Sequence, residues 1–138
     1  RFPNMYRKLS KAGSDYISIP SAFTETTGKR HWHTLLKARA IENFCYIFAP
    51  AQGGIHYNGR KTFGHSMIVS PDGKILKELK KKEGVITVKV NPLLSKKLRK
   101  IIPSLKKINY SWDFTSLIFE PKMLLISSLI LALSSFSL

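Results

Sequence analysis

Four histidines and a single cysteine are the first side chains of this 138-residue chain to consider for metal binding or catalysis: His31, His33, Cys45, His56 and His65. His31 and His33 are two positions apart in a stretch with helical periodicity, so their side chains should diverge and cannot share one ion. The other two histidines have no cluster of carboxylates or thiols near them at metal-ligand spacing. We therefore expect neither a metal site nor a cofactor.

Cys45 and the adjacent residues His65 and Ser66 are the candidates for nucleophilic catalysis. Cys45 follows a helical pattern and opens an apolar run, and a buried thiol without a cationic neighbour stays protonated and unreactive. His65 and Ser66 lie in an expected strand over residues 63–69. Neighbours in a strand point to opposite faces, so the two cannot act together as base and nucleophile. We expect structural roles for all three residues.

The stretch from His31 to Gln52 predicts the elements that would hold these side chains. Apolar residues recur at helical spacing in its first part, and an apolar run from Cys45 onward is typical of a strand covered on both faces. Arg39 interrupts the apolar side of the helix, and Glu42 is within reach of its guanidinium. A helix that leads into a buried strand predicts a layered α/β interior.

The remaining elements are predicted from apolar periodicity and turn residues. We expect a short helix that begins with Pro3 and ends before Gly13, and a second helix that begins near Lys29 with Thr27 as its cap. The other expected elements are strands at 15–20, 63–69, 74–79 and 85–90, a loop at 21–28, turns at 53–54, 57–60 and 71–73, and a helix from Asn91 that Pro103 ends.

The chain is strongly basic, with 23 Lys and Arg against 8 Asp and Glu and a formal net charge of +15. Such a field attracts nucleic acid or acidic lipid, but solvated lysine faces give the same total without that partner. Aromatic residues for base stacking are lacking among the basic residues between Lys74 and Lys107, so we predict no nucleic-acid partner. One cysteine excludes an internal disulfide and fits a reducing compartment, here the cytoplasm.

Residues 111–138 differ in composition from residues 1–110, which we take as one domain. From Pro121 the chain is uncharged after Lys122 and rich in leucine and serine. A transmembrane helix needs about 20 predominantly apolar residues, and this run is shorter and contains five serines. We expect a divergent apolar extension and no membrane span, with attachment to a membrane interface as the alternative.

Several short motifs fall in the order found in one enzyme family. They are Arg1-Phe2-Pro3 with Tyr6-Arg7, Pro20-Ser21-Ala22-Phe23-Thr24, Thr27-Gly28 before His31-Trp32, Leu35-Leu36 with Ala38 to Asn43, Ala51-Gln52, and Gly64 to Val69 with Pro71 and Gly73. Over residues 1–107 the chain resembles the C-terminal half of a nitrilase-superfamily carbon-nitrogen hydrolase, in particular the amidase branch that acts on deaminated glutathione.

This resemblance implies an α-β-β-α sandwich and hydrolysis of non-peptide carbon–nitrogen bonds in small amides by a Glu-Lys-Cys triad. In the family the cysteine stands just before the Arg-Phe-Pro motif, and the glutamate and lysine lie further upstream. We therefore expect a truncated hydrolase without catalytic residues, inactive alone, that meets a small amide substrate only if an N-terminal half is supplied. The alternative is a basic protein without catalysis that binds a membrane or nucleic acid.

The resemblance also implies roles by position. Five consecutive residues would form part of the wall of the substrate pocket: Pro20, Ser21, Ala22, Phe23 and Thr24. The helices near residues 3–12 and 29–43 would form a homodimer surface. Arg39 and Glu42 would be a structural polar pair rather than catalytic groups, because groups that act on substrate must point into the pocket.

Overall fold

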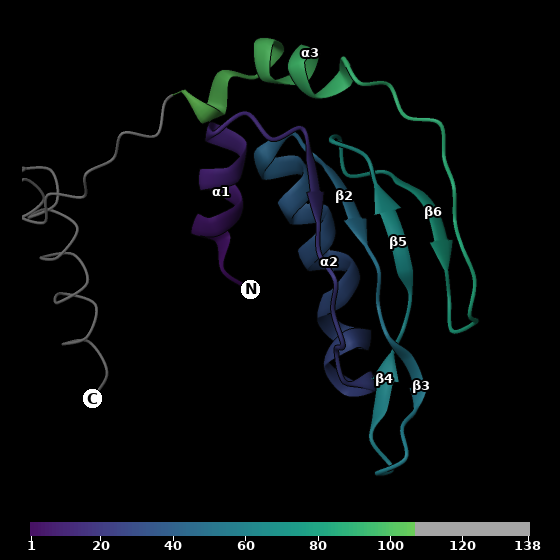
Figure 1. Cartoon of the computed structure of the whole chain (residues 1–138). Helices are drawn as coiled ribbons and strands as arrows, with labels where there is room; N and C mark the ends of the chain where they lie inside the picture. The colour runs from purple at the N-terminus through teal and green to yellow at the C-terminus, as the bar shows by residue number, and fades with distance from the viewer. Residues whose placement is uncertain (107–138) are drawn as a thin grey trace, which may run out of the picture. The chain divides into compact units, whose positions relative to one another are not determined.

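A four-stranded sheet with two helices against one face forms the centre of residues 1–106, the part of the chain described by the computed structural model (Figure 1). The elements are α1 (Pro3–Lys11), β1 (Tyr16–Ser18), α2 (Glu25–Asn43), β2 (Tyr46–Ala49), β3 (Gly53–Ile55), β4 (Lys61–Phe63), β5 (Ser66–Val69), β6 (Ile75–Leu79), α3 (Leu94–Ile101) and the 3₁₀ helix η1 (Pro103–Leu105). The sheet order is β1-β2-β5-β6, and β3 pairs with β4 separately. The predicted mixed α/β class is confirmed.

The main sheet is mixed because its connections differ. α2 returns the chain to the starting end of the sheet, so β1 and β2 are parallel, whereas β2, β5 and β6 pair in antiparallel fashion. Ile17 lies opposite Ile47 and Ile47 opposite Val69, which places these three buried side chains in one row. The row packs in the same core as Trp32 and Leu36, so the apolar side of α2 covers this face.

Both ends of α1 agree with the prediction from sequence. Pro3 occupies the first helical position, where its missing N–H leaves no bond unmade. The helix ends at Lys11, and Gly13 follows with φ of +98°, a left-handed conformation that glycine adopts without steric cost.

α2 begins earlier than predicted. Thr24 is the N-cap, and its Oγ1 accepts a hydrogen bond from the Thr27 backbone N–H at 3.4 Å, so Thr27 lies inside the helix and is not its cap. Gly28, which suggested a loop, packs against Phe63: a Cβ at position 28 would lie 2.3 Å from the Phe63 Cβ. The predicted loop at 21–28 is therefore wrong from Glu25 onward, because this glycine serves close packing and not a turn.

The predicted strand at 63–69 is split into two strands. Gly64 and His65, between β4 and β5, have φ values of +70° and +61°, which lie outside the extended region. The break lets β4 pair with β3 while β5 pairs with β2. The predicted turn at Gly53-Gly54 is likewise wrong, since both residues belong to β3.

Residues 85–90 form no strand, although apolar residues alternate there. Alternate side chains of the segment are half-buried, and Val85 is almost fully exposed. Lys77 on β6 donates a side-chain hydrogen bond to the Thr87 carbonyl at 3.4 Å, but among the described strands β6 pairs only with β5. The alternation therefore reflects side-chain burial without a backbone ladder.

The other predicted elements are present with shifted ends. Strands predicted at 15–20 and 74–79 are β1 and β6, the buried run from Cys45 contains β2, and α3 ends before Pro103. No helix within residues 1–106 is both long enough and apolar enough to cross a membrane. The expected extension at residues 111–138 lies outside the described residues.

Candidate functional site

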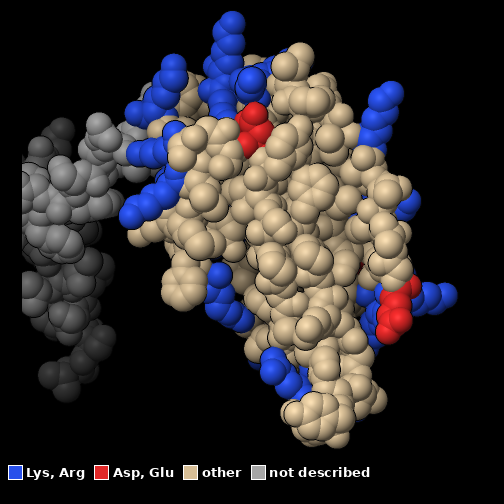
Figure 2. Space-filling view, in the orientation of Figure 1, with Lys and Arg blue, Asp and Glu red and all other residues tan. Residues whose placement is uncertain are grey.

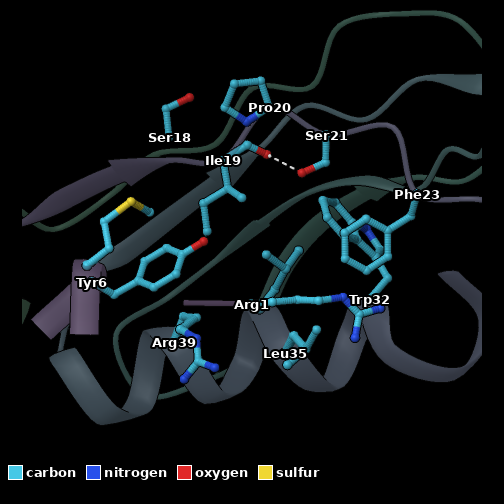
Figure 3. A pocket seen from close by; sticks show the side chains of 12 residues that line it. Arg1, Tyr6, Ser18, Ile19, Pro20, Ser21, Phe23, Trp32, Leu35 and Arg39 are labelled. Atoms are coloured by element: carbon cyan, nitrogen blue, oxygen red, sulfur yellow. Dashed lines mark hydrogen bonds between the residues drawn. The ribbon is translucent and has the colours of Figure 1, made fainter. Parts of the chain in front are cut away.

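A pocket of about 270 Å³ lies between α1, α2 and the segment that follows β1 (Figure 3). Three of the five predicted wall residues line it: Pro20, Ser21 and Phe23. Arg1 and Arg39 also line the pocket, so two guanidinium groups stand beside an otherwise largely apolar cavity. The role of these residues toward a substrate stays a prediction.

Phe23 and Trp32 form the aromatic end of this pocket. Their ring centroids are 5.0 Å apart at an interplanar angle of 59°, and the Arg1 Cζ lies 5.3 Å from the Phe23 centroid. The Trp32 indole N–H donates a hydrogen bond to the His65 carbonyl at 2.8 Å. The aromatic end is therefore held in place by His65, which does not line the pocket.

Arg39 lines the pocket from α2, but its charge is already matched. Its Nη1 lies 2.6 Å from Glu42 Oε2, and its Cζ lies 5.5 Å from the centre of the Tyr6 ring. The Asn43 side-chain amide donates to the Arg39 carbonyl at 2.9 Å. These contacts favour the structural pairing predicted for Arg39 and Glu42, because the guanidinium is committed to groups of the helix.

The turn after β1 also borders a second pocket, lined by Ser21 and Ala22 among others. Backbone bonds hold the turn: the Ser21 N–H donates to the Pro50 carbonyl, and the Gln52 N–H donates to the Ser21 carbonyl, both at 3.0 Å. Thr24 lines neither of these pockets and caps α2 instead. Pro20 and Ser21 thus border both pockets, Phe23 only the first and Ala22 only the second, and the wall assignment of all five residues stays a prediction.

Cys45 lies in the core, outside both pockets, as the prediction of a core role requires. Its Sγ donates to the Ser14 carbonyl at 3.1 Å, and Arg99 Nη2 lies 3.1 Å from Sγ, so the expectation of no cationic neighbour is wrong. Burial nevertheless raises the pKa of the thiol, although a hydrogen bond with Ser10 and the charge of Arg99 oppose that shift. Cys45 is a protonated thiol at neutral pH.

The side chains of His31 and His56 each make one hydrogen bond. His31 Nδ1 lies 3.0 Å from Arg1 Nη2, and His56 Nε2 lies 2.8 Å from Thr62 Oγ1. Neither histidine belongs to a group of three or more metal-ligand side chains among the described residues.

His33 and His65 instead converge on Glu78, which sequence reasoning missed. Burial raises the pKa of the Glu78 carboxyl, but hydrogen bonds from His65 and His33 outweigh it and hold the pKa below its usual value. The expectation that no carboxylate accompanies these histidines is wrong, because residues of three separate elements meet only after folding. Ser66, next to His65, accepts a hydrogen bond from the Ala51 N–H at 2.9 Å and takes no part.

Lysine and arginine side chains project around the edge of the face drawn in Figure 2, with several close together at its upper left, and the middle of the view is largely without them.

A mixed sheet covered by two helices, with pockets at the turn that follows its edge strand, defines a layered α/β protein. Residues 1–100 match the family model described as carbon-nitrogen hydrolase, and the chain belongs to this family. The resemblance to nitrilase-superfamily hydrolases is confirmed.

Relatives of known name support this membership. The chain is 51% identical over 106 residues to a deaminated glutathione amidase of Synechocystis sp., an alignment that covers 77% of this chain and 39% of that protein. It is 43% identical over 110 residues to the probable hydrolase nit2 of Schizosaccharomyces pombe, covering 78% of this chain and 40% of that protein. The chain therefore spans about two fifths of the length of these relatives.

Solved structures show the same fold. The NitFhit protein of C. elegans superposes with a TM-score of 0.76 at 38% identity, covering 79% of this chain and 26% of that one. Saccharomyces cerevisiae Nit3, a member of branch 10 of the nitrilase superfamily, gives a TM-score of 0.73 at 30% identity, covering 80% of this chain and 41% of that one.

Proposed function

We propose that this chain supplies the C-terminal part of an amidase-type carbon-nitrogen hydrolase that acts on small non-peptide amides. The observation that carries the proposal is the 51% identity to a deaminated glutathione amidase over 106 residues. The carbon-nitrogen hydrolase model also matches residues 1–100, which include the turn at the pockets. Pro20, Ser21, Ala22 and Phe23 form one wall of the substrate pocket in this proposal, and Thr24 supports it by capping α2.

The nucleophile of the proposed enzyme comes from outside residues 1–106, either from another segment of a longer polypeptide or from another chain. Covalent amide hydrolysis of the family type needs an activated thiol at the pocket. Cys45 is fully buried in the core with a raised pKa, so it does not meet that requirement. In this proposal the described residues bind and orient the amide substrate, and the Glu-Lys-Cys triad lies in the segment outside residues 1–106.

The open edge of the sheet supports this arrangement. Among the described strands β1 pairs only with β2, and Tyr16 on β1 is 44% exposed. Tyr16 stacks on Tyr46 with ring centroids 5.5 Å apart and lies 6.1 Å from the Phe48 ring. An unpaired edge that carries the exposed Tyr16 ring is suited to accept a further strand and a second apolar layer.

Complementation tests the proposal. The 138-residue chain alone should not hydrolyse deaminated glutathione or other omega-amides. Co-expression with a segment carrying the N-terminal part of the Synechocystis relative should restore turnover. The same segment with its catalytic cysteine replaced by alanine is the control and should give none. Turnover by the isolated chain that survives Cys45→Ala would contradict the proposal.

A homodimer through α1 and α2 is a second part of the proposal. Met5 and Leu9 on α1 are 49% and 39% exposed, and Ile41 on α2 is 46% exposed, so both helices keep apolar side chains at the surface. Met5→Lys with Leu9→Lys should convert a dimer into a monomer in light scattering. Replacing the exposed Lys89, outside both helices, by Glu is the control, and a monomeric starting chain would contradict the proposed dimer.

The alternative of a basic binding protein rests on the net charge of +15. It predicts binding to anionic vesicles or DNA that weakens steeply with added salt. Lack of binding at low salt would exclude it.

A further inference from the structure

Three potential metal ligands from separate elements meet at one side of the sheet. They are His33 on α2, His65 just before β5, and Glu78 on β6. His33 Nε2 lies 3.0 Å from Glu78 Oε1, and His65 Nδ1 contacts the same oxygen. The two histidine nitrogens and the carboxylate oxygen all lie within 4.8 Å of one another.

His65 is fixed in place by its surroundings. Its carbonyl accepts the Trp32 indole N–H at 2.8 Å, and its own N–H donates to the Lys80 carbonyl at 2.6 Å. The imidazole stacks on Phe63 with ring centroids 4.0 Å apart and an interplanar angle of 18°. The residue keeps a left-handed φ of +61° that non-glycine residues seldom adopt. A ring held by this many contacts presents its Nδ1 in a defined direction, as a metal ligand must.

The donor set and its spacing suit zinc. Two imidazole nitrogens and one carboxylate oxygen are the protein ligands of many three-ligand zinc sites, which hold water in the fourth position. Tetrahedral bonds to such ligands separate the donor atoms by about 3.3 Å, and the 3.0 Å between His33 Nε2 and Glu78 Oε1 is close to that spacing. Side-chain exposures of 35%, 17% and 23% for His33, His65 and Glu78 leave a path for an ion and its water.

We propose that His33, His65 and Glu78 form a zinc-binding site that joins α2 to the β5–β6 hairpin. The carboxylate now accepts hydrogen bonds from both imidazoles, and the ion would replace those bonds with direct coordination. The inference is independent of the proposed hydrolase activity, because none of the three residues lines the pocket between α1 and α2. The competing account is a hydrogen-bonded trio with no affinity for metal.

Zinc binding to the full 138-residue chain, first stripped with a chelator, tests the site. We expect one zinc per chain by calorimetry and elemental analysis, and a rise in the unfolding temperature as zinc saturates the folded state. Cobalt(II) bound in place of zinc should give the strong visible absorption of tetrahedral coordination. Residues 107–138 contain neither histidine nor cysteine, so they offer no competing imidazole or thiolate.

Single substitutions assign the ligands. His33→Ala and Glu78→Gln should each weaken zinc binding by at least about tenfold, with an unchanged circular dichroism spectrum. These positions are preferred to His65, whose replacement would also disturb the packing around Phe63. His31→Ala and His56→Ala are matched controls, since these histidines contact only Arg1 and Thr62 in the hydrogen bonds above, and both should bind zinc as the parent chain does.

Two results would overturn the inference. One is a parent chain that binds no zinc at a stoichiometry of one, which would leave the hydrogen-bonded trio as the explanation. The other is unchanged affinity in both His33→Ala and Glu78→Gln, which would place any bound zinc elsewhere.

Discussion

Arg99 and Asp15 are 84 positions apart in the sequence, yet Arg99 Nη1 lies 2.7 Å from Asp15 Oδ1. The second guanidinium nitrogen of Arg99 donates to the carbonyls of Ser14 at 2.7 Å and Phe44 at 3.2 Å. One side chain on α3 therefore bonds to the segment that enters β1 and to the segment that leaves α2, and it links α3 to the sheet.

Replacing Arg99 should destabilise the fold. Arg99→Met keeps much of the aliphatic stem but removes the guanidinium that donates to Asp15 and to the Ser14 and Phe44 carbonyls, so we expect a loss of about 2 kcal/mol in the free energy of unfolding. Urea denaturation measures it. Lys100→Met on the same helix is the control, because Lys100 is exposed, and an equal loss in both variants would refute the role given to Arg99.

Gly28→Ala should be destabilising even though alanine favours helices. The helix gains about 1 kcal/mol from the substitution, but the new Cβ would lie 2.3 Å from Phe63 Cβ, and overpacking costs about 1–3 kcal/mol. A net loss of stability in thermal denaturation is the expected result. The exposed Thr26→Ala in the same helix serves as control. Higher stability of Gly28→Ala would disprove the close contact.

Thr24→Ala should cost about 1 kcal/mol of stability, since the Thr27 N–H loses its side-chain acceptor at the start of α2. Thr24→Ser keeps an oxygen at the same place and should restore most of that stability. Chemical denaturation of the two variants gives the comparison. If serine and alanine are equally destabilising, the cap is not responsible.

Glu25 predicts a dependence of stability on acid pH. Hydrogen bonds from Lys81 at 2.9 Å and Lys29 at 3.2 Å lower the pKa of Glu25 from 4.5 to about 2. A pKa depressed in the folded state stabilises the fold above the unfolded-state value of 4.5, and that stabilisation disappears as the pH falls toward 2. Glu25→Gln should therefore unfold at a lower temperature than the parent chain near neutral pH.

The difference for Glu25→Gln should shrink in acid and also with added salt, because these lysines are exposed and the pairs are screened. Thermal scans across the acid range measure the dependence on pH, and scans at increasing salt concentration measure the dependence on salt. A difference that stays constant with pH would rule out the ionised carboxylate as its source.

Cys45 should resist alkylation in the folded chain. The thiol is fully buried and its pKa is raised, so reaction with a thiol reagent should proceed only as fast as the core opens. Mass spectrometry of native and urea-unfolded samples compares the rates. Rapid labelling of the native chain would show that the core position assigned to Cys45 is wrong.

Local signals explain which parts of the fold could be predicted. Pro3 and Gly13 mark the ends of α1 because each acts on its own backbone, and the Pro71 to Gly73 turn defines the β5–β6 hairpin in the same way. The prediction of where α2 starts failed because Thr24 and Thr27 are both good caps. Phe63, distant in sequence, determines the packing at Gly28, which follows Thr27.

Contacts between distant elements explain what sequence reasoning missed at the candidate sites. Arg99 reaches Cys45 only because α3 folds back to the ends of β1 and α2. His33, His65 and Glu78 come together at the break between β4 and β5. The hydrophobic periodicity of the sequence does not predict that break. The turn at Pro20 to Phe23 was assigned to the pocket because its motif resembles that of the hydrolase family. Net charge and hydropathy do not contain that information.

The parallel pairing of β1 with β2 has a consequence for the order of folding. The β5–β6 hairpin closes a short turn, whereas Ile17 can meet Ile47 only after the whole of α2 has formed and packed. Closing the longer connection costs more chain entropy, so we expect the hairpin to form early and β1 to dock late. Both β1 and β6 have one neighbouring strand in the sheet, but β1 docks late, so its amides should be the less protected of these two edge strands in hydrogen exchange.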